Sequence, residues 1–336
     1  ALGSRFRRVA RAAAAERERV RAFISRIPAG RFSGQLSGAA LALARTAFAF
    51  GPDQPVSAHQ LEDHATCEFR TLAKRLLRLE VDERDDAELG PRERGVLLHR
   101  CLERFFGRLR EEGRLPLQAG TEDLALLREI AAAEMEAFAA REHVGHPALW
   151  QLKQAELLGE LAAVVEADAG AAPLELERKF GFDEPDSWPA LRLGEVHVRG
   201  IIDRVDAAPA GTLLVLDYKS GRARSLSAKL KEETLLAPEF QLALYAALLR
   251  QRGAARVDAG YFSLRDAART RTLREAGVDP DALRVEEKVL ERVALMRAGR
   301  FEVRPLSCDF CELKPACRLV ALPTDPEENG GELSRG

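Results

Sequence analysis

The spacing of apolar residues predicts a mostly helical first half of the chain. Two stretches, residues 1–27 and 57–168, carry apolar side chains at helical intervals with charged residues between them. Four residues that break helices divide the longer stretch into about four helices: Pro91, Gly113, Pro116 and Gly120. Residues 30–56, between the two stretches, are rich in glycine and proline and predict a looser connection around a short apolar helix.

From Leu174 onward the pattern changes to the alternation that is typical of strands. The predicted strands cover residues 174–180, 196–206, 213–218 and 259–264. Helical spacing returns at 240–252 and at 281–297, so the second half predicts strands with helices between them. The polar, glycine-containing end of the chain, from Thr324, predicts a disordered tail.

Composition limits the possible partners and compartments of the protein. The chain has 336 residues, 46% of them apolar, which is enough for one large core or two modest ones. Its formal net charge of −2 gives no overall sign of nucleic-acid binding, so a binding site has to be a local patch. Residues 1–31 offer one such patch, with nine arginines and two glutamates, although a solvated helix has the same composition.

The sequence shows no segment for membrane insertion or export. The longest apolar run, residues 39–50, contains Arg45 and is too short to span a bilayer, and the start has no signal-peptide pattern. Five cysteines, an odd number, indicate a cytoplasmic protein whose thiols are unbridged or bound to metal. Because the sequence does not begin with Met, we expect an excised piece of a longer protein.

The first candidate functional residues lie in the segment LLVLDYKSGR, where the apolar run 213–216 is followed by an acid and a lysine. Asp217 and Lys219 point to the same face of the strand, and a hairpin centred near Ala210 sets Asp203 opposite Asp217. Two carboxylates held this close repel each other unless a cation or a proton lies between them. Mg²⁺ suits such a pair, and a nearby lysine can orient or deprotonate its water. A solvated, salt-bridged hairpin is the alternative interpretation.

Two further patterns are ambiguous when each is taken alone. In GVLLHRCLERFF, His99 follows Gly95 on an apolar helix, where a solitary histidine is commonly a core residue but also serves as a metal ligand. In FQLALY, Gln241 and Tyr245 share one face of a predicted helix, which is also an ordinary arrangement on a helix surface.

Taken in order, four motifs carry a family resemblance: G-x-x-x-H at 95–99, G-x-x-D at 200–203, D-x-K at 217–219 and Q-x-x-x-Y at 241–245. Together they resemble the RecB-type branch of the PD-(D/E)XK nuclease superfamily, over about residues 57–318. The resemblance implies an α/β fold with a restriction-endonuclease-like core, a mixed sheet flanked by helices. It also implies an enzyme that cuts DNA with Mg²⁺ or Mn²⁺.

The resemblance assigns roles residue by residue. It implies three metal ligands: His99, Asp203 and Asp217. The two aspartates are also counted among the catalytic residues, with Lys219 as the catalytic lysine. The residues of the Q-x-x-x-Y helix are expected to position DNA and the lysine: Gln241 and Tyr245. Glu177 in LERKF corresponds to an accessory acid of the first core strand.

The cysteines predict a second metal site. CDFCELKPAC sets three thiols, Cys308, Cys311 and Cys317, in one loop, which needs a fourth ligand that either Cys67 or Cys101 can supply. The segment before Cys67 resembles the S-x-x-x-L-E-x-x-x-x-C-P-F entry motif of the same nuclease branch, with Glu68 in place of the usual proline.

In that branch one upstream cysteine and three near the C-terminus hold a [4Fe–4S] cluster. The resemblance therefore implies cluster ligation by four residues: Cys67, Cys308, Cys311 and Cys317. Cys101 remains as a buried thiol. A zinc site with the same ligands is the alternative, because spacing alone does not separate zinc from an iron–sulfur cluster.

Three regions are expected along the chain. Residues 1–56 form a helical extension or linker, 57–322 the nuclease domain, and 323–336 a disordered tail. Within the domain we expect a helical part at 57–168, an α/β core at 174–300 and an iron–sulfur staple in the cysteine-rich segment 305–322.

Among members of the superfamily, the chain most resembles the C-terminal nuclease domain of AddB-type helicase–nuclease subunits. That resemblance implies DNA and a helicase body as partners, in repair of double-strand breaks by recombination. Two alternatives remain open: a free-standing CRISPR-associated iron–sulfur nuclease, and a non-catalytic iron–sulfur module that only binds DNA. The D-x-K motif at Asp217–Lys219 is intact, which favours an active enzyme over the second alternative.

Overall fold

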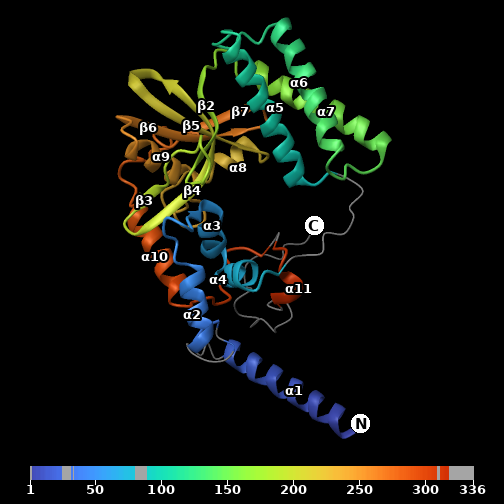
Figure 1. The fold of residues 1–336 in the computed structure, drawn as a ribbon, viewed down its shortest axis with the longest axis vertical. Coiled ribbons are helices and arrows are strands. Elements are labelled where there is room, and N and C mark those ends of the chain that lie inside the picture. Colours follow the sequence, from blue (N-terminus) through green and yellow to red (C-terminus); the bar gives the residue numbers. More distant parts are fainter. Residues whose placement is uncertain (1, 25–31, 33, 80–88, 309–310, 318–336) are drawn as a thin grey trace, which may run out of the picture. The chain divides into compact units, whose positions relative to one another are not determined.

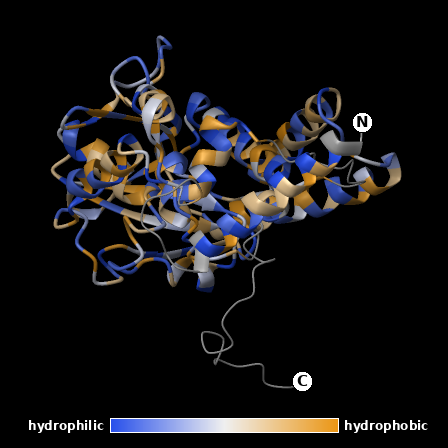
Figure 2. Ribbon diagram, turned by 90° about the horizontal axis from the view of Figure 1, so that it is seen from below, coloured by the Kyte–Doolittle hydropathy of each residue, from blue (hydrophilic) through white to orange (hydrophobic). Residues whose placement is uncertain are grey.

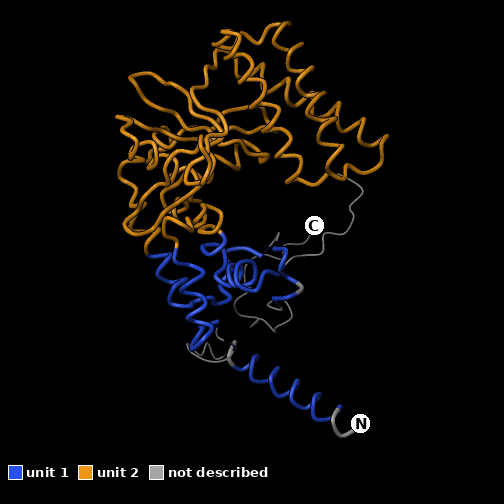
Figure 3. Tube along the Cα trace, viewed as in Figure 1, with its two compact units in different colours: residues 1–49, 63–82, 291–336 blue, residues 50–62, 83–290 orange. Residues whose placement is uncertain are grey.

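A computed structural model describes residues 2–24, 32, 34–79, 89–308 and 311–317. The chain divides into two compact units (Figure 3). Unit 1 comprises residues 1–49, 63–82 and 291–336, and unit 2 comprises residues 50–62 and 83–290. The predicted tail at 323–336 lies outside the described residues, and the predicted domain boundaries remain predictions.

Unit 1 consists of short helical elements and one long N-terminal helix (Figure 1). They are α1 (Leu2–Ile24), α2 (Gly38–Ala47), α4 (Glu68–Thr71), the π-helical turn η1 (Leu72–Leu76), α11 (Lys314–Cys317), the end of α3 (Ala58–Thr66) and the end of α10 (Val285–Arg297). In its core the ring of Phe301 packs against Phe48 and His64, with centroids 5.6 and 6.0 Å away. The predicted helix at 1–27 is α1, and the short helix predicted within 30–56 is α2.

Unit 2 begins with a layer of three long helices: α5 (Pro91–Glu111), α6 (Thr121–Ala139) and α7 (Pro147–Ala167). Their boundaries follow the predicted breakers, because Pro91 opens α5, Gly113 takes a left-handed φ of 66° after it, and Gly120 is the N-cap of α6. The helices of the structure carry both hydrophobic and hydrophilic residues along their length (Figure 2). Among the described residues, no helix has both the length and the apolar character of a membrane span.

The centre of unit 2 is a mixed sheet of seven strands: β1 (Val56–Ser57), β2 (Pro173–Phe180), β3 (Leu191–Leu193), β4 (Val196–Ala208), β5 (Thr212–Lys219), β6 (Arg256–Ser263) and β7 (Ala268–Thr272). The order is β1-β4-β5-β6-β7, and β2 and β3 also pair with β4. The β1–β4 and β5–β6 pairs are parallel, and the others are antiparallel. This mixed sheet flanked by helices confirms the predicted α/β fold class.

The helices of unit 2 cover opposite faces of the sheet (Figure 1). Tyr218 and Phe262, neighbours on β5 and β6, belong to the core formed with α5, α6 and α7. Lys219 points the other way, because successive side chains of a strand alternate, and it meets Gln241 at the start of α9 (Gln241–Gln251). The short helix α8 (Ala223–Ser227) follows β5 and contacts β6 and β7.

A buried arginine ties the helical layer to the sheet. Arg204 of β4 has no exposed surface and donates to both carboxylate oxygens of Asp206, each at 2.6 Å, and to Asp168 at the end of α7. It also donates to the hydroxyl of Tyr218 at 3.2 Å and lies over the ring of Phe106. Every nitrogen of the guanidinium group is therefore paired, as a buried charge requires.

We expect Arg204→Met to lower the free energy of unfolding by about 3–5 kcal/mol, because it leaves two buried carboxylates without their main partner. Arg269 is the matched control, since it pairs with the same Asp168 and Asp206 but its side chain is 39% exposed. Arg269→Met should cost about 1 kcal/mol or less. Chemical unfolding of both variants tests this, and equal losses would contradict the role assigned to Arg204.

Candidate active site

Three acidic side chains lie in one row across adjacent strands. The β4–β5 ladder pairs Arg204 with Leu216, so the next step sets Asp203 opposite Asp217. The β2–β4 ladder pairs residues 176 with 204 and 178 with 202, so Glu177 is the other neighbour of Asp203. The turn between β4 and β5 is centred at Ala210, which has a left-handed φ of 58°. The predicted hairpin centre and the predicted Asp203–Asp217 juxtaposition are therefore confirmed.

Glu177 has an unusual backbone conformation. Its φ is 42°, in a region that residues other than glycine seldom adopt and that costs about 1–3 kcal/mol. The residue lies inside β2, between Leu176 and Arg178, which both pair in register with β4. Such outliers persist where the surrounding structure enforces them, and here the strain accompanies a side chain that reaches Asp203 and its neighbours.

His99 of α5 joins this row of acids from the helical layer. Its Nδ1 lies 3.2 Å from Glu177 Oε1 and 3.7 Å from Asp203 Oδ1, and its ring packs edge-on against Tyr218. Among the described residues, His99, Glu177 and Asp203 are the one group of three candidate ligands whose ligand atoms lie within 4.8 Å of one another. Asp203 also accepts a hydrogen bond from the backbone N–H of Tyr218 at 2.8 Å.

The close packing of these charged groups raises the pKa values of Asp203 and His99. Burial, and next the charge of Asp217, raise the pKa of Asp203 to about 7. Burial by itself would lower the pKa of His99, but the hydrogen bond with Glu177 and the charges of Asp203, Glu177 and Asp217 raise it to about 9. The group thus favours added positive charge, either as protons or as a cation.

The catalytic lysine predicted from the sequence lies at the end of β5. Lys219 Nζ is 2.7 Å from Asp217 Oδ2 and donates to Gln241 Oε1 at 2.7 Å. Gln241 Nε2 donates in turn to the hydroxyl of Tyr245 at 3.3 Å. Although burial by itself would lower it, the pKa of Lys219 is raised by Asp217 and Asp203, so the side chain is an ammonium. The structure thus brings Asp217, Lys219, Gln241 and Tyr245 together.

Gly200 makes room for this arrangement. A Cβ at this position would lie 2.9 Å from the ring of Phe180 and 3.4 Å from that of Tyr245. The two rings meet edge-to-face with centroids 6.0 Å apart. The glycine of the G-x-x-D motif therefore allows Tyr245 to approach β4 three residues before Asp203.

The residues present suit a divalent cation. An imidazole and carboxylates form a ligand set of the kind that binds Mg²⁺ or Mn²⁺. Asp217 Oδ2 is buried and, despite its proximity to Lys219, has no well-aligned hydrogen bond. Of the three metal ligands predicted from the sequence, His99 and Asp203 lie in the compact group with Glu177, and Asp217 lies beside them at the lysine. The metal role of each residue remains a prediction.

The predicted cluster cysteines converge in unit 1. Cys67, Cys308, Cys311 and Cys317 line one cavity of about 170 Å³, together with apolar residues that include Phe69 and Leu313. Burial raises the pKa of the Cys67 thiol, although hydrogen bonds from nearby backbone N–H groups act in the opposite direction and favour the thiolate. All five cysteines are described and none forms a disulfide. Of the two candidates for a fourth ligand, Cys67 therefore lies beside the three cysteines of the loop, and the metal role of all four remains a prediction.

Cys101 lies elsewhere, as predicted. It is fully buried in the core between α5 and its neighbours, and burial raises the pKa of its thiol to about 12. It has the properties of a small apolar core residue.

Sequence reasoning missed two parts of the site's surroundings. Glu62 of α3 accepts hydrogen bonds from the backbone N–H groups of Phe240 and Gln241, and the only signal for it was its place in the L-E pair of the entry motif. The Arg204 network had no signal, because Arg204 sits in an alternating strand where a buried position for arginine is unexpected.

Comparisons with known proteins agree with this geometry. Residues 55–318 match the model of the PD-(D/E)XK nuclease superfamily. The chain is 33% identical over 194 residues to a subunit of an ATP-dependent helicase/deoxyribonuclease from Desulforudis audaxviator, and 28% identical over 195 residues to the corresponding subunit from Lacticaseibacillus casei. These alignments cover 53% and 52% of the chain but only 16% of each relative.

The family match covers most of the chain and includes all four sequence motifs. The similarity to these helicase/deoxyribonuclease subunits confirms the resemblance to AddB-type nucleases. The chain therefore belongs to the PD-(D/E)XK nuclease superfamily.

Proposed function

We propose that the protein is a metal-dependent deoxyribonuclease that hydrolyses phosphodiester bonds of DNA. One observation carries the proposal: His99 and the acids of β4 and β5 lie close to Lys219, which contacts Asp217 and donates to Gln241. His99, Asp203 and Asp217 would hold Mg²⁺ or Mn²⁺, with Glu177 as a further acid next to them. When bound, the cation would neutralise charge on the phosphate and lower the pKa of a water molecule.

The chain's own residues divide the remaining tasks. In this proposal the ammonium of Lys219 would orient the attacking water and stabilise negative charge on the phosphate. Gln241 fixes that ammonium through a 2.7 Å hydrogen bond, and Tyr245 supports Gln241 from one turn further along α9. The lysine side chain is 29% exposed, against 1% for Asp217, so part of it is open to solvent.

We further propose that Cys67, Cys308, Cys311 and Cys317 hold a [4Fe–4S] cluster with a structural role. The four cysteines line one cavity of about 170 Å³, which supports a shared metal site. The choice of a cluster over zinc rests on the family resemblance, in which one upstream cysteine and three near the C-terminus hold a [4Fe–4S] cluster.

The biological setting follows from the relatives. They are named as subunits of ATP-dependent helicase/deoxyribonucleases, and the matched segment is 16% of their length. We therefore propose that the chain is the nuclease part of a helicase–nuclease, with a helicase as its partner, in recombinational repair of DNA double-strand breaks. Unbridged thiols are typical of the cytoplasm, which is the compartment we propose.

The proposed function is tested by incubating the purified 336-residue chain with labelled single-stranded or duplex DNA. We expect degradation with Mg²⁺ or Mn²⁺ and without ATP, since the proposed metal ligands and Lys219 lie together and the proposed hydrolysis has no step that uses ATP. A chain that binds DNA but never cuts it would instead be the non-catalytic binding module.

Arg222 and Arg224, just after Lys219, are expected to contact the DNA backbone. Both are exposed and form no ion pair among the described residues, whereas Lys229 nearby is paired with Glu239. Replacing both arginines with Ser should weaken binding similarly for all sequences and flatten the salt dependence of log K by about 1.4 for single strands. Binding titrations at several salt concentrations measure both quantities.

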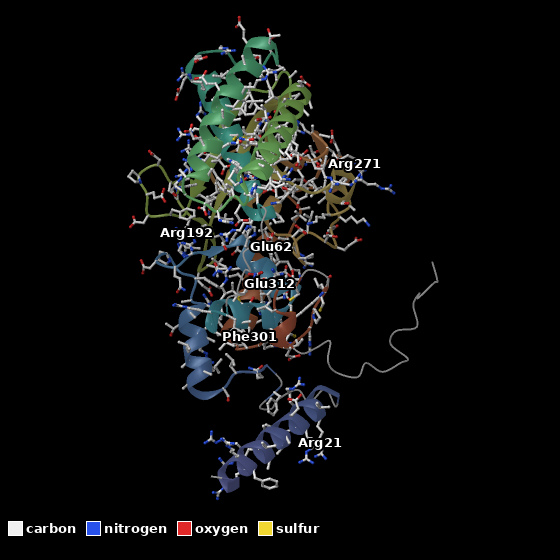
Figure 4. The ribbon with its side chains drawn as sticks, turned by 90° about the vertical axis from the view of Figure 1, so that its right-hand side faces the viewer. Arg21, Glu62, Arg192, Arg271, Phe301 and Glu312 are labelled. Atoms are coloured by element: carbon white, nitrogen blue, oxygen red, sulfur yellow. The ribbon has the colours of Figure 1, made fainter. Side chains whose placement is uncertain are left out.

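The control for this prediction is Arg192→Ser/Arg256→Ser. Arg192 (labelled in Figure 4) is on β3, and Arg256 lies at the end of β6 opposite to Ser263, the neighbour of Lys219. The control variant should keep the salt dependence of the wild type. If it lost affinity while the Arg222/Arg224 variant did not, the DNA path would run along Arg192 and Arg256 and not along Arg222 and Arg224.

A further inference from the structure

A carboxylate from outside the catalytic motifs caps the helix that carries Gln241. Glu62 of α3 (labelled in Figure 4) accepts hydrogen bonds at Oε1 from the backbone N–H of Phe240 at 2.9 Å and of Gln241 at 3.3 Å. Phe240 is the N-cap residue of α9, and its side chain cannot accept a hydrogen bond. Glu62 therefore accepts the N–H groups of the N-cap residue and of the first residue of α9, which have no partner inside the helix.

Glu62 is held firmly in this role. Its other oxygen, Oε2, lies 3.0 Å from Nδ1 of His59, one turn earlier on α3, and its side chain is only 17% exposed. Burial raises the pKa of Glu62, but the hydrogen bonds from His59 and Phe240 outweigh burial, and the pKa lies below its ordinary value. The group is thus a carboxylate at neutral pH, and its charge is favourable at the N-terminus of a helix.

The capped residue is also the one that orients the lysine. Gln241 receives a hydrogen bond from Lys219 at its side chain and donates its backbone N–H to Glu62. A shift of the first turn of α9 would move Gln241 Oε1 away from Nζ of Lys219. Misplacement of a catalytic group by about 1 Å can lower the rate by about a hundredfold.

From these contacts we propose that Glu62 is a positioning residue of the nuclease: it fixes the N-terminus of α9 so that Gln241 holds Lys219 in its working position. This inference rests on the proposed function of the site. In this role the length of the Glu62 side chain matters more than its charge, because its oxygen has to accept hydrogen bonds from two backbone N–H groups. The proposal therefore predicts that a side chain of equal length without charge replaces it better than a shorter side chain with charge.

Two conservative variants of Glu62 separate the effect of side-chain length from the effect of charge. Glu62→Gln keeps an oxygen at the same distance from both amides, and we expect its kcat for DNA cutting to stay within about threefold of the wild type. Glu62→Asp keeps the charge but is one methylene shorter, and Glu62→Ala removes the acceptor. Both should lower kcat about tenfold to a hundredfold with little change in KM, because substrate binding itself is not altered.

A double-mutant comparison tests the route through Gln241. If Glu62 acts through Gln241, then Glu62→Ala should add little to the loss already caused by Gln241→Ala. Glu122→Gln is the matched control, since Glu122 is an exposed acid in the first turn of α6 and should leave kcat unchanged. Thermal unfolding is recorded for every variant, and kinetics are measured well below the lowest midpoint. Should Glu62→Ala not fold, the Gln and Asp variants carry the same test.

Three results would overturn the inference. The first is a wild-type kcat in folded Glu62→Ala, and the second is a higher kcat for Glu62→Asp than for Glu62→Gln. The third is a double variant, Glu62→Ala with Gln241→Ala, whose loss of kcat equals the product of the two single losses. Lys219→Ala in the same assay separates this inference from the proposed function. If Lys219→Ala cuts DNA normally, the proposed site is wrong. If Lys219→Ala is inactive and Glu62→Ala is fully active, only the role of Glu62 is wrong.

Discussion

Lys219→Ala should reduce DNA cutting by at least about a hundredfold to a thousandfold, because it removes the ammonium that stabilises charge next to the acids. Asp217→Ala should have an effect of similar size, since Asp217 both holds Lys219 at 2.7 Å and adds charge to the proposed cation site. Neither change creates a large cavity, and Asp217→Ala relieves repulsion with Asp203. We therefore expect both variants to fold, which circular dichroism and thermal unfolding can establish.

The matched control for this prediction is Lys179→Ala. Lys179 of β2 forms an ion pair with Glu184 at 2.7 Å, the same distance as the Lys219–Asp217 pair, but its side chain is 44% exposed. Its loss should leave cutting unchanged. If folded Lys219→Ala cut DNA at the rate of the wild type, the role assigned to Lys219 would have to be abandoned.

Replacing Cys67 or Cys308 with Ser should remove the metal of the second site and lower the stability of the fold by about 5 kcal/mol, the entropy of a cross-link across a long loop. The two residues lie far apart in the sequence, so the proposed metal would close a loop that covers most of the chain. Protein prepared anaerobically should be brown and contain iron and acid-labile sulfide, and both variants should be colourless.

Cys101→Ala serves as the control for the cysteine prediction. Cys101 is fully buried in unit 2 and does not line the cavity of the other four cysteines, so its replacement should leave the iron content unchanged. Zinc at one equivalent and no iron, after anaerobic preparation, would favour the zinc site instead. Loss of iron in Cys101→Ala would contradict the assignment of the four ligands.

The β4–β5 hairpin of the candidate site could be predicted from sequence because its geometry is local. A two-residue period and a turn at Ala210 are enough to set Asp203 opposite Asp217, and both lie on one hairpin of consecutive strands. The limits of α5 and α6 could be predicted for a similar reason, since proline and glycine act on the backbone where they occur.

The rest of the site depends on contacts between distant segments. His99 meets Glu177 and Glu62 meets Gln241 only after the helices have packed on the sheet, and no local pattern encodes such pairs. The family resemblance supplied His99 but gave no role to Glu62. The edge strand β7 also escaped prediction, because its sequence ARTRT is polar and short. Helix α10 begins at Val285 and not at 281, since the turn around Pro280 delays it.

Cutting of labelled DNA by the purified chain without ATP, with Mg²⁺ or Mn²⁺ present or removed by a chelator, tests most sharply whether this site is a nuclease. We expect DNA fragments to appear with either metal, to disappear with the chelator, to return when metal is restored, and to be absent with Lys219→Ala. Intact DNA with both metals, from folded protein that binds DNA, would show that the acids around Asp203 do not form a nuclease site.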